Sequence, residues 1–140
     1  TRLLGLNLRL PEINAAIATV QMKKLPKFLK TREQNAKLLS ELLSKSKLNL
    51  PIQRKNEKVN WYLYTVTTPK RNILLKKLNV KGIGAASYYP IPVHKTPFYK
   101  SKTKLPVTDW AASHVLSLPI HPKVTTKNIE FIAKTISGIL

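Results

Sequence analysis

Cysteine is absent from the 140 residues of this sequence. Disulfide bonds, thiolate metal ligands and thiol catalysis are therefore excluded for these residues, and a reducing, cytoplasmic location is expected. Acidic residues are scarce as well, because six Asp and Glu stand against 25 Lys and Arg, for a formal net charge of +19. With so few carboxylates, general acid/base catalysis by a carboxylate pair is not expected.

Long apolar runs are also missing. Runs such as residues 73–75 fall far short of the roughly 20 residues that a membrane-spanning helix needs, and no signal-peptide core opens the chain. We therefore expect no membrane partner. The hydrophobic fraction of 43% is still enough for one compact domain with a core.

The positive charge would attract an acidic protein surface, a phosphorylated ligand or nucleic acid. The basic residues are nevertheless scattered along the chain. They do not form the single stripe with interleaved aromatic residues that is typical of nucleic-acid binding. A solvated, lysine-rich surface is therefore the favoured interpretation, and nucleic acid remains an alternative partner.

A long amphipathic helix is predicted to begin at Pro11, because the first helical turn accepts proline. Apolar residues then recur at spacings of three and four as far as Leu43. Pro26 lies inside this pattern and removes a helical hydrogen bond, so we expect a kink or a break there, which gives one long helix or two in line. The predicted organisation is a lead-in, a connecting helix and a small α/β domain, at residues 1–10, 11–45 and 46–140.

Shorter elements are predicted beyond this helix from residue type and periodicity. They are strands at 61–68 and 83–89, helices at 69–79 and 107–115, an extended piece at 116–122, and a last helix capped by Thr125 or Thr126. Prolines make regular structure unexpected between residues 90 and 106. In the second strand, alternation predicts that one of Tyr88 and Tyr89 packs in the core. The predicted fold class is α+β, with a small, mainly antiparallel sheet packed with helices.

Two segments are candidate binding sites. Pro92 and Pro97 restrict the backbone around His94, and a stiff exposed loop positions a binding residue at low entropic cost. Asn7 and Arg9 lie two apart in a nonhelical segment, where an amide and a guanidinium can bind a phosphate or carboxylate. An ordinary surface histidine and a polar lead-in to the helix are the alternatives.

Catalytic and metal sites are not predicted. The three histidines lack the close spacing of metal ligands, so we expect no metal. No nucleophile lies beside a base in a recognisable pattern, so no catalytic residue is nominated. On its own residues, the chain does not resemble a complete enzyme.

Six features nevertheless follow one another in the order of a known family. They are GLNLRLPEINAAIATVQMKKL, the later Arg32, NWYLYTV, RNILLKKLNVKGIG, YYPIPVHKTPFY and VLSLPIHP. With them the whole chain resembles the C-terminal part of the DegT/DnrJ/StrS sugar aminotransferases. These are pyridoxal-phosphate enzymes of the aspartate-aminotransferase fold, type I, that aminate nucleotide-linked keto-sugars.

This resemblance implies a small C-terminal domain that is inactive alone. The Schiff-base lysine of the family belongs to a large N-terminal domain, and no lysine here lies in a matching motif, so pyridoxal phosphate is expected only with that domain. Within the G-x-N-x-R pattern, Asn7 and Arg9 would bind the cofactor, with the asparagine reaching its phosphate across a homodimer. His94 of the Y-x-P-x-H turn, with Tyr89 and Lys95 beside it, would bind an anionic sugar nucleotide.

One departure from the family pattern is Asp109, which stands where the family usually has glutamate. The resemblance also implies association with a large domain, either within a homodimer or as a separate partner. The alternative function is a stand-alone basic module that binds nucleic acid or an acidic protein.

Overall fold

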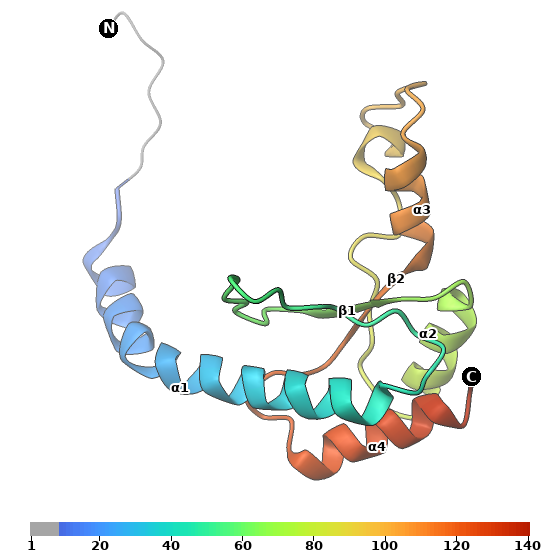
Figure 1. Ribbon diagram of the computed structural model, residues 1–140. Coiled ribbons are helices and arrows are strands. Elements are labelled where there is room, and N and C mark those ends of the chain that lie inside the picture. Colours follow the sequence, from blue (N-terminus) through green and yellow to red (C-terminus); the bar gives the residue numbers. More distant parts are fainter. Residues whose placement is uncertain (1–8) are drawn as a thin grey trace, which may run out of the picture.

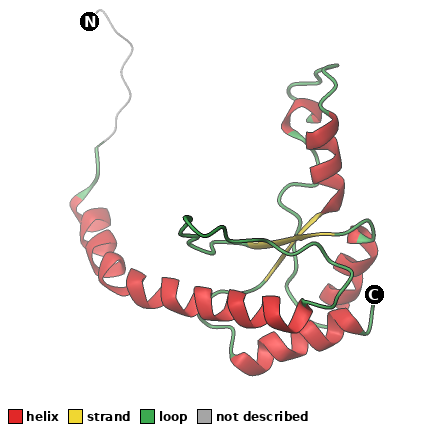
Figure 2. Cartoon of the chain, viewed as in Figure 1, coloured by secondary structure: helices red, strands yellow, loops and turns green. Residues whose placement is uncertain are grey.

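The computed structural model describes residues 9–140. The elements are α1 (Glu12–Leu43), β1 (Tyr64–Thr67), α2 (Arg71–Val80), the 3-10 helix η1 (Val93–Lys95), α3 (Pro106–His114), β2 (Val115–Leu118) and α4 (Thr126–Ser137). Figures 1 and 2 show the two strands crossing the middle of the molecule, with α1 and α4 side by side along one face. The fold is α+β with a small antiparallel sheet, which confirms the predicted class.

The sheet is apolar on the face toward these helices and polar on the other. Its inward-facing pairs, all buried, are Tyr64 with Leu118 and Val66 with Leu116. On the opposite face, Thr65 Oγ1 lies 2.9 Å from Ser117 Oγ. Ala86 adds a single antiparallel bridge to Ser117, which extends the sheet beyond β2.

One apolar core joins the sheet to α1, α2 and α4. The helical side chains that are fully buried in it are Ala36, Leu39, Leu43, Leu74, Leu78, Ile129 and Ile136. The start of α4 follows the predicted cap: Asn128 N donates to Thr125 Oγ1 over 3.3 Å, and Thr125 N donates to Asn128 Oδ1 over 3.0 Å. These two bonds satisfy amides that the first helical turn leaves without partners.

Two predicted strands are wrong in extent. The first is confined to residues 64–67, because Trp61 has a φ of 50°, a left-handed conformation that a strand does not contain. The second, predicted at 83–89, is reduced to the bridge at Ala86. Tyr88 and Tyr89 follow that bridge and are 50% and 75% exposed, so neither packs in the core.

Helix α1 divides into two halves. Its second half packs on the core, whereas the first half, which precedes Pro26, exposes Ile13, Ile17 and Val20. The assigned helix continues through Pro26, and Figure 1 shows its axis curving as the first half leaves the rest of the molecule. We call the sheet with α2, α4 and the second half of α1 the body. Among residues 9–140, no helix combines the length and apolarity that crossing a bilayer requires.

Candidate functional site

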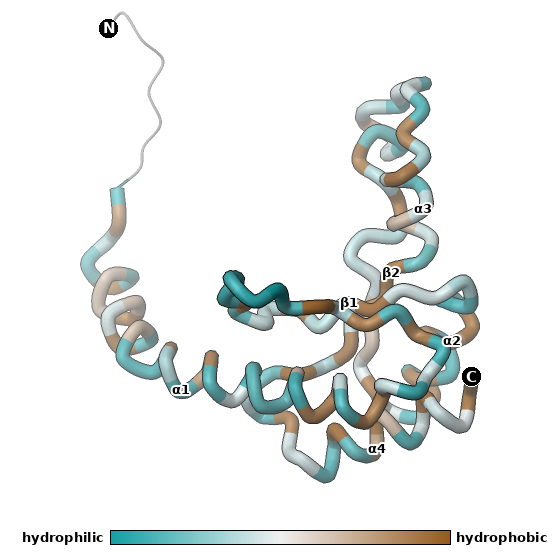
Figure 3. The backbone as a smooth tube through the Cα atoms, in the orientation of Figure 1, coloured by the Kyte–Doolittle hydropathy of each residue, from teal (hydrophilic) through white to brown (hydrophobic). Residues whose placement is uncertain are grey.

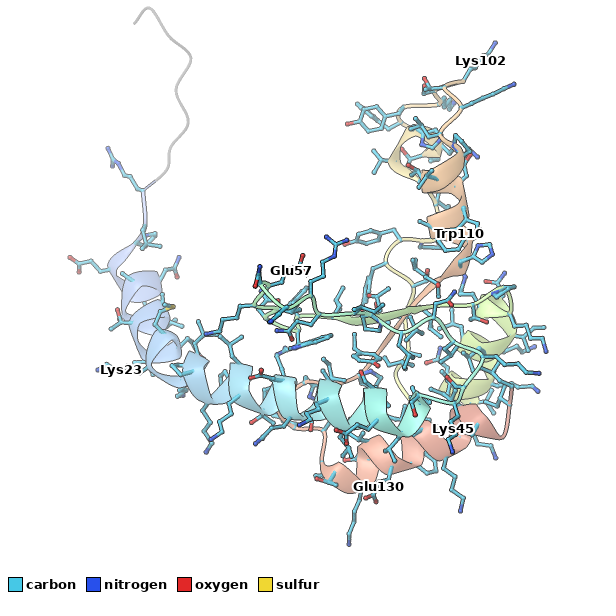
Figure 4. All side chains as sticks on the ribbon, viewed as in Figure 1. Lys23, Lys45, Glu57, Lys102, Trp110 and Glu130 are labelled. Carbon is cyan, nitrogen blue, oxygen red and sulfur yellow. The ribbon has the colours of Figure 1, made fainter. Side chains whose placement is uncertain are left out.

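Residues 87–114 extend from the body as a proline-rich loop that returns as α3, and we call them the arm. Figure 4 places Lys102 at its far end and Trp110 closer to the body. At its foot, Ala86 N donates to Ser117 O over 3.1 Å and Ser117 N donates to Ala86 O over 2.7 Å. Helix α3 passes directly into β2, so the arm is continuous with a strand of the sheet.

The turn that carries His94 is the 3-10 helix η1. Pro92 precedes it with an extended backbone, and Lys95 N donates to Pro92 O over 2.9 Å. On the far side of the loop, Ser101 N donates to His94 O over 2.8 Å. The carbonyl of His94 is therefore held by Ser101, and the turn that contains His94 is closed by the bond between Lys95 and Pro92.

The His94 side chain faces α3 instead of solvent, contrary to the exposed position that the sequence predicts. It is 11% exposed, and its Nε2 lies 3.5 Å from Asp109 Oδ1. Lys95 Nζ lies 2.8 Å from the same oxygen. Neither His94 Nε2 nor Asp109 Oδ1 has a partner with hydrogen-bond geometry among the described residues. One carboxylate oxygen thus faces two of the three candidate substrate-binding residues and partly neutralises the charge of this turn.

Asp109 is the residue of this cluster that sequence reasoning did not nominate as a site residue. The sequence singled it out only as a departure from the glutamate of the family pattern, and the structure places it in the first turn of α3, where the helix dipole favours an acidic residue. That position explains the residue without any binding role. Only the structure brings it against His94 and Lys95, which precede it by more than ten residues.

The two tyrosines at the start of the arm have different surroundings. Tyr89 is exposed and contacts Tyr88 edge-on, with ring centroids 5.8 Å apart. Tyr88, not Tyr89, lines a hollow of about 240 Å³ at the foot of the arm. Its other polar lining side chains are Arg32, Tyr62, Ser117 and His121.

Arg32 is fixed in this hollow by backbone acceptors. Its Nη1 donates to Trp61 O over 3.1 Å and to Tyr62 O over 2.9 Å, and its guanidinium carbon lies 5.9 Å from the centre of the Tyr62 ring. Trp61, which supplies one of these carbonyls, has a left-handed backbone conformation. Arg32, noted in the sequence only as part of a family pattern, therefore joins α1 to the segment before β1.

Of the two predicted cofactor-binding residues, the structure describes only Arg9. Asn7 falls outside the described residues, and Arg9 lies exposed just before α1. Figure 1 shows the beginning of α1 and the arm well apart, at the left and right ends of the molecule in this view. The structure of one chain therefore does not bring Arg9 and His94 into one site.

The described residues do not fit covalent attachment of pyridoxal phosphate. Every lysine among residues 9–140 is exposed, whereas an activated Schiff-base lysine is enclosed so that desolvation lowers its pKa. Within the same residues, no three His, Asp or Glu side chains gather closely enough to hold a metal ion. Lys100, Lys102 and Lys104, near the end of the arm, form no ion pair with a described residue.

Comparisons with known proteins give the relationships of the chain. The profile of the DegT/DnrJ/EryC1/StrS aminotransferase family matches residues 1–137. The dTDP-3-amino-3,4,6-trideoxy-alpha-D-glucose transaminase of Streptomyces venezuelae is 34% identical over 123 residues, which are 84% of this chain and 32% of that protein. The pleiotropic regulatory protein of Geobacillus stearothermophilus is 30% identical over 141 residues, 96% of this chain and 38% of that protein.

A solved structure agrees with these relatives. S. venezuelae DesV in complex with a ketimine intermediate superposes with a TM-score of 0.91 at 28% identity, over 98% of this chain and 38% of that one. The chain thus spans between about a third and two fifths of the length of the relatives it matches. It belongs to the DegT/DnrJ/EryC1/StrS aminotransferase family.

Proposed function

We propose that this chain is the small C-terminal domain of a pyridoxal-phosphate-dependent aminotransferase for nucleotide-linked keto-sugars. Catalysis then requires a large domain that supplies the Schiff-base lysine. The observation that carries the proposal is the superposition on the DesV ketimine complex, which includes nearly all of this chain but only 38% of the other. The exposure of every described lysine supports a lysine supplied from elsewhere.

The first half of α1 supports a missing partner domain. Leu10, Ile13, Ile17 and Val20 recur at helical spacing and remain exposed. A continuous apolar stripe of this kind is typical of a surface that another domain or protein covers. We propose that the large domain covers it, so that α1 connects the two domains.

The site residues then take different roles. His94 and Tyr89 contact the sugar nucleotide, and Lys95 contributes through its pairing with Asp109. Lys100 and Lys102, which form no ion pair with a described residue, attract the anionic diphosphate. Asn7 and Arg9 bind the cofactor phosphate in a neighbouring subunit of a homodimer, which fits the separation between the start of α1 and the arm within one chain (Figure 1).

The test compares the chain alone with the chain plus a large domain. The pure chain is incubated with one equivalent of pyridoxal phosphate and reduced with borohydride, and its intact mass and modified peptides are measured. We expect no stoichiometric adduct on a single lysine and no amination of a nucleotide-linked keto-sugar. Adding the large domain of the S. venezuelae relative should give the imine absorption band, and Ile17→Glu in this chain should weaken that assembly. A stoichiometric adduct on one lysine of the chain alone would contradict the proposal.

A second candidate is a stand-alone module for nucleic acid, and one observation favours it. The arm places Phe98 and Tyr99, both exposed, next to Lys100 and Lys102, so aromatic and basic groups lie together at its end. Binding to a single-stranded oligonucleotide should then fall steeply with salt and be lost in the variant with Lys100, Lys102 and Lys104 changed to Glu. No binding at moderate salt rejects this candidate.

A further inference from the structure

Arg71 is a buried arginine that the proposed function does not use. It is 6% exposed, and it forms no ion pair with a described residue. It is also the first residue of α2, where the helix dipole disfavours a positive charge. A cation that is buried at the start of a helix without a carboxylate partner is unfavourable there on local grounds. The reason for an arginine at this position must therefore be a contact with another part of the fold.

That reason lies in the last turn of α3. Arg71 Nη2 donates to Ala112 O over 2.8 Å, and Arg71 Nε donates to Ser113 O over 3.2 Å. The last carbonyls of a helix have no intrahelical donor, and the negative end of the dipole favours a cation there. The guanidinium therefore satisfies the end of the arm helix from within the body.

A separate bond holds the next residue of the arm. Thr68 N donates to His114 O over 3.1 Å, which fixes the point where α3 becomes β2. This bond fixes where α3 ends, and neither it nor the bond at the foot of the arm from Ser87 Oγ to Val115 O, over 3.1 Å, acts on α3 before its last residue. The two bonds from Arg71 act on preceding carbonyls, at Ala112 and Ser113, and so supply the further points that define the direction of α3.

We propose that Arg71 is a positioning residue that sets the angle of the arm on the body. Because α3 carries Asp109, this angle also sets where His94 and Lys95 are presented. The importance of that presentation for a substrate rests on the proposed function. The geometry of the arm does not, so it can be tested without cofactor, substrate or large domain.

The absence of cysteine makes a distance measurement direct, because two introduced thiols are the only ones in the chain. Spin labels are attached in the double variant Lys45→Cys and Lys102→Cys, which pairs the body with the far end of the arm (Figure 4). Distance distributions between the two labels are recorded in the protein that retains Arg71 and in its R71M and R71K variants, with I136A as the control. Ile136 is fully buried in α4, so I136A loses stability without touching the arm.

We expect one narrow distance distribution in the protein that retains Arg71 and in I136A. In R71M this narrow distribution should be lost. In R71K the width should be intermediate, because the single amine of lysine can donate to one carbonyl at a time. A narrow distance in folded R71M, or equal broadening in I136A, overturns the proposal. If R71M does not fold, R71K decides the question: a distribution broader than that of I136A supports a positioning role, and an unchanged one overturns it. Either result leaves the aminotransferase proposal to its own cofactor test.

Discussion

The body of the molecule and the segments that extend from it use the same apolar residue types with opposite outcomes. In the second half of α1, Leu39 and Leu43 are fully buried, whereas Ile13 and Ile17 in the first half are 70% and 57% exposed. Figure 3 shows apolar residues along both halves. Helical periodicity therefore predicts an apolar helix face. Only the structure shows which part of that face is buried within this chain.

The arm repeats this contrast. Its exposed large apolar side chains are Tyr88, Tyr89, Ile91, Val93, Phe98, Tyr99, Leu105, Val107 and Trp110. Figure 1 shows the arm and the first half of α1 extending from the body toward the same side. Extended apolar surface of this kind is unusual for a protein that works alone. The body thus buries most of its apolar residues within the chain, and the two extensions carry the exposed apolar surface that the proposed function assigns to a partner.

The largest expected effect on the free energy of unfolding comes from shortening a buried side chain in the second half of α1. Leu39→Ala should lower the free energy of unfolding by about 2–5 kcal/mol, because it leaves a cavity in the core. Ile17→Ala should change it by less than about 0.5 kcal/mol, because this side chain is exposed in the isolated chain. Urea unfolding of both variants measures the difference. Equal losses would show that the first half of α1 also packs on the body.

The next effect concerns Pro26, which lies between the two halves of α1. Replacing a helix-interior proline with alanine improves helix propensity by about 3 kcal/mol. Because the first half has few partners in the body, we expect this gain to appear as local order there. In Pro26→Ala, backbone amides of residues 16–25 should exchange with deuterium more slowly, while those of residues 35–43 stay unchanged. Pro26→Gly controls for removal of the ring alone and should not give this protection.

A smaller effect is expected at Tyr64 in the body. Burial raises the pKa of the Tyr64 phenol above its usual value, and a hydrogen bond with Ser40 Oγ at 2.7 Å partly opposes this. The folded state therefore favours the neutral phenol. This stabilisation is complete below about pH 10, the pKa of an unfolded tyrosine, and is lost as the pH rises further.

Tyr64→Phe should lose about 1 kcal/mol at neutral pH with the Ser40 hydrogen bond. Its stability should then fall less than that of the unsubstituted chain between about pH 9 and about pH 11. Ser40→Ala is the matched control, because it removes the hydrogen bond but keeps the phenol and its alkaline loss. Parallel pH profiles for Tyr64→Phe and the unsubstituted chain would reject burial as the cause.

Much of the body can be predicted from the sequence because its signals are local. The periodicity of Ile129, Ile132 and Ile136 and the cap at Thr125 specify α4 without tertiary information. The strand at 83–89 could not be corrected in this way. Its residues have strand character, but pairing depends on a neighbouring chain segment, and β2 offers a bridge only at Ala86.

The candidate site is predictable only in part, for the same reason. The prolines around His94 indicate a restricted turn, and the family pattern draws attention to it. The burial of its ring against Asp109 depends on the return of the chain as α3, which no local pattern encodes. Arg71 is hidden in the same way, because its partners are backbone carbonyls more than forty residues later.

The smallest effect on global stability is expected at Asp109, in the arm. Its carboxylate is about a third exposed and pairs with Lys95, and pairs of this kind contribute only about 0–1 kcal/mol. Asp109→Asn should therefore change the free energy of unfolding by less than about 1 kcal/mol. The local result should be clear, because the His94 ring loses the charge that faces its Nε2. Its ring-proton signals should shift, while His114 and His121 serve as internal references in a chain with three histidines.

Asp109→Glu restores the carboxylate and should return the His94 signals toward their original positions. A global loss as large as that expected for Leu39→Ala would instead make the arm part of the cooperative body and would remove the contrast between the two.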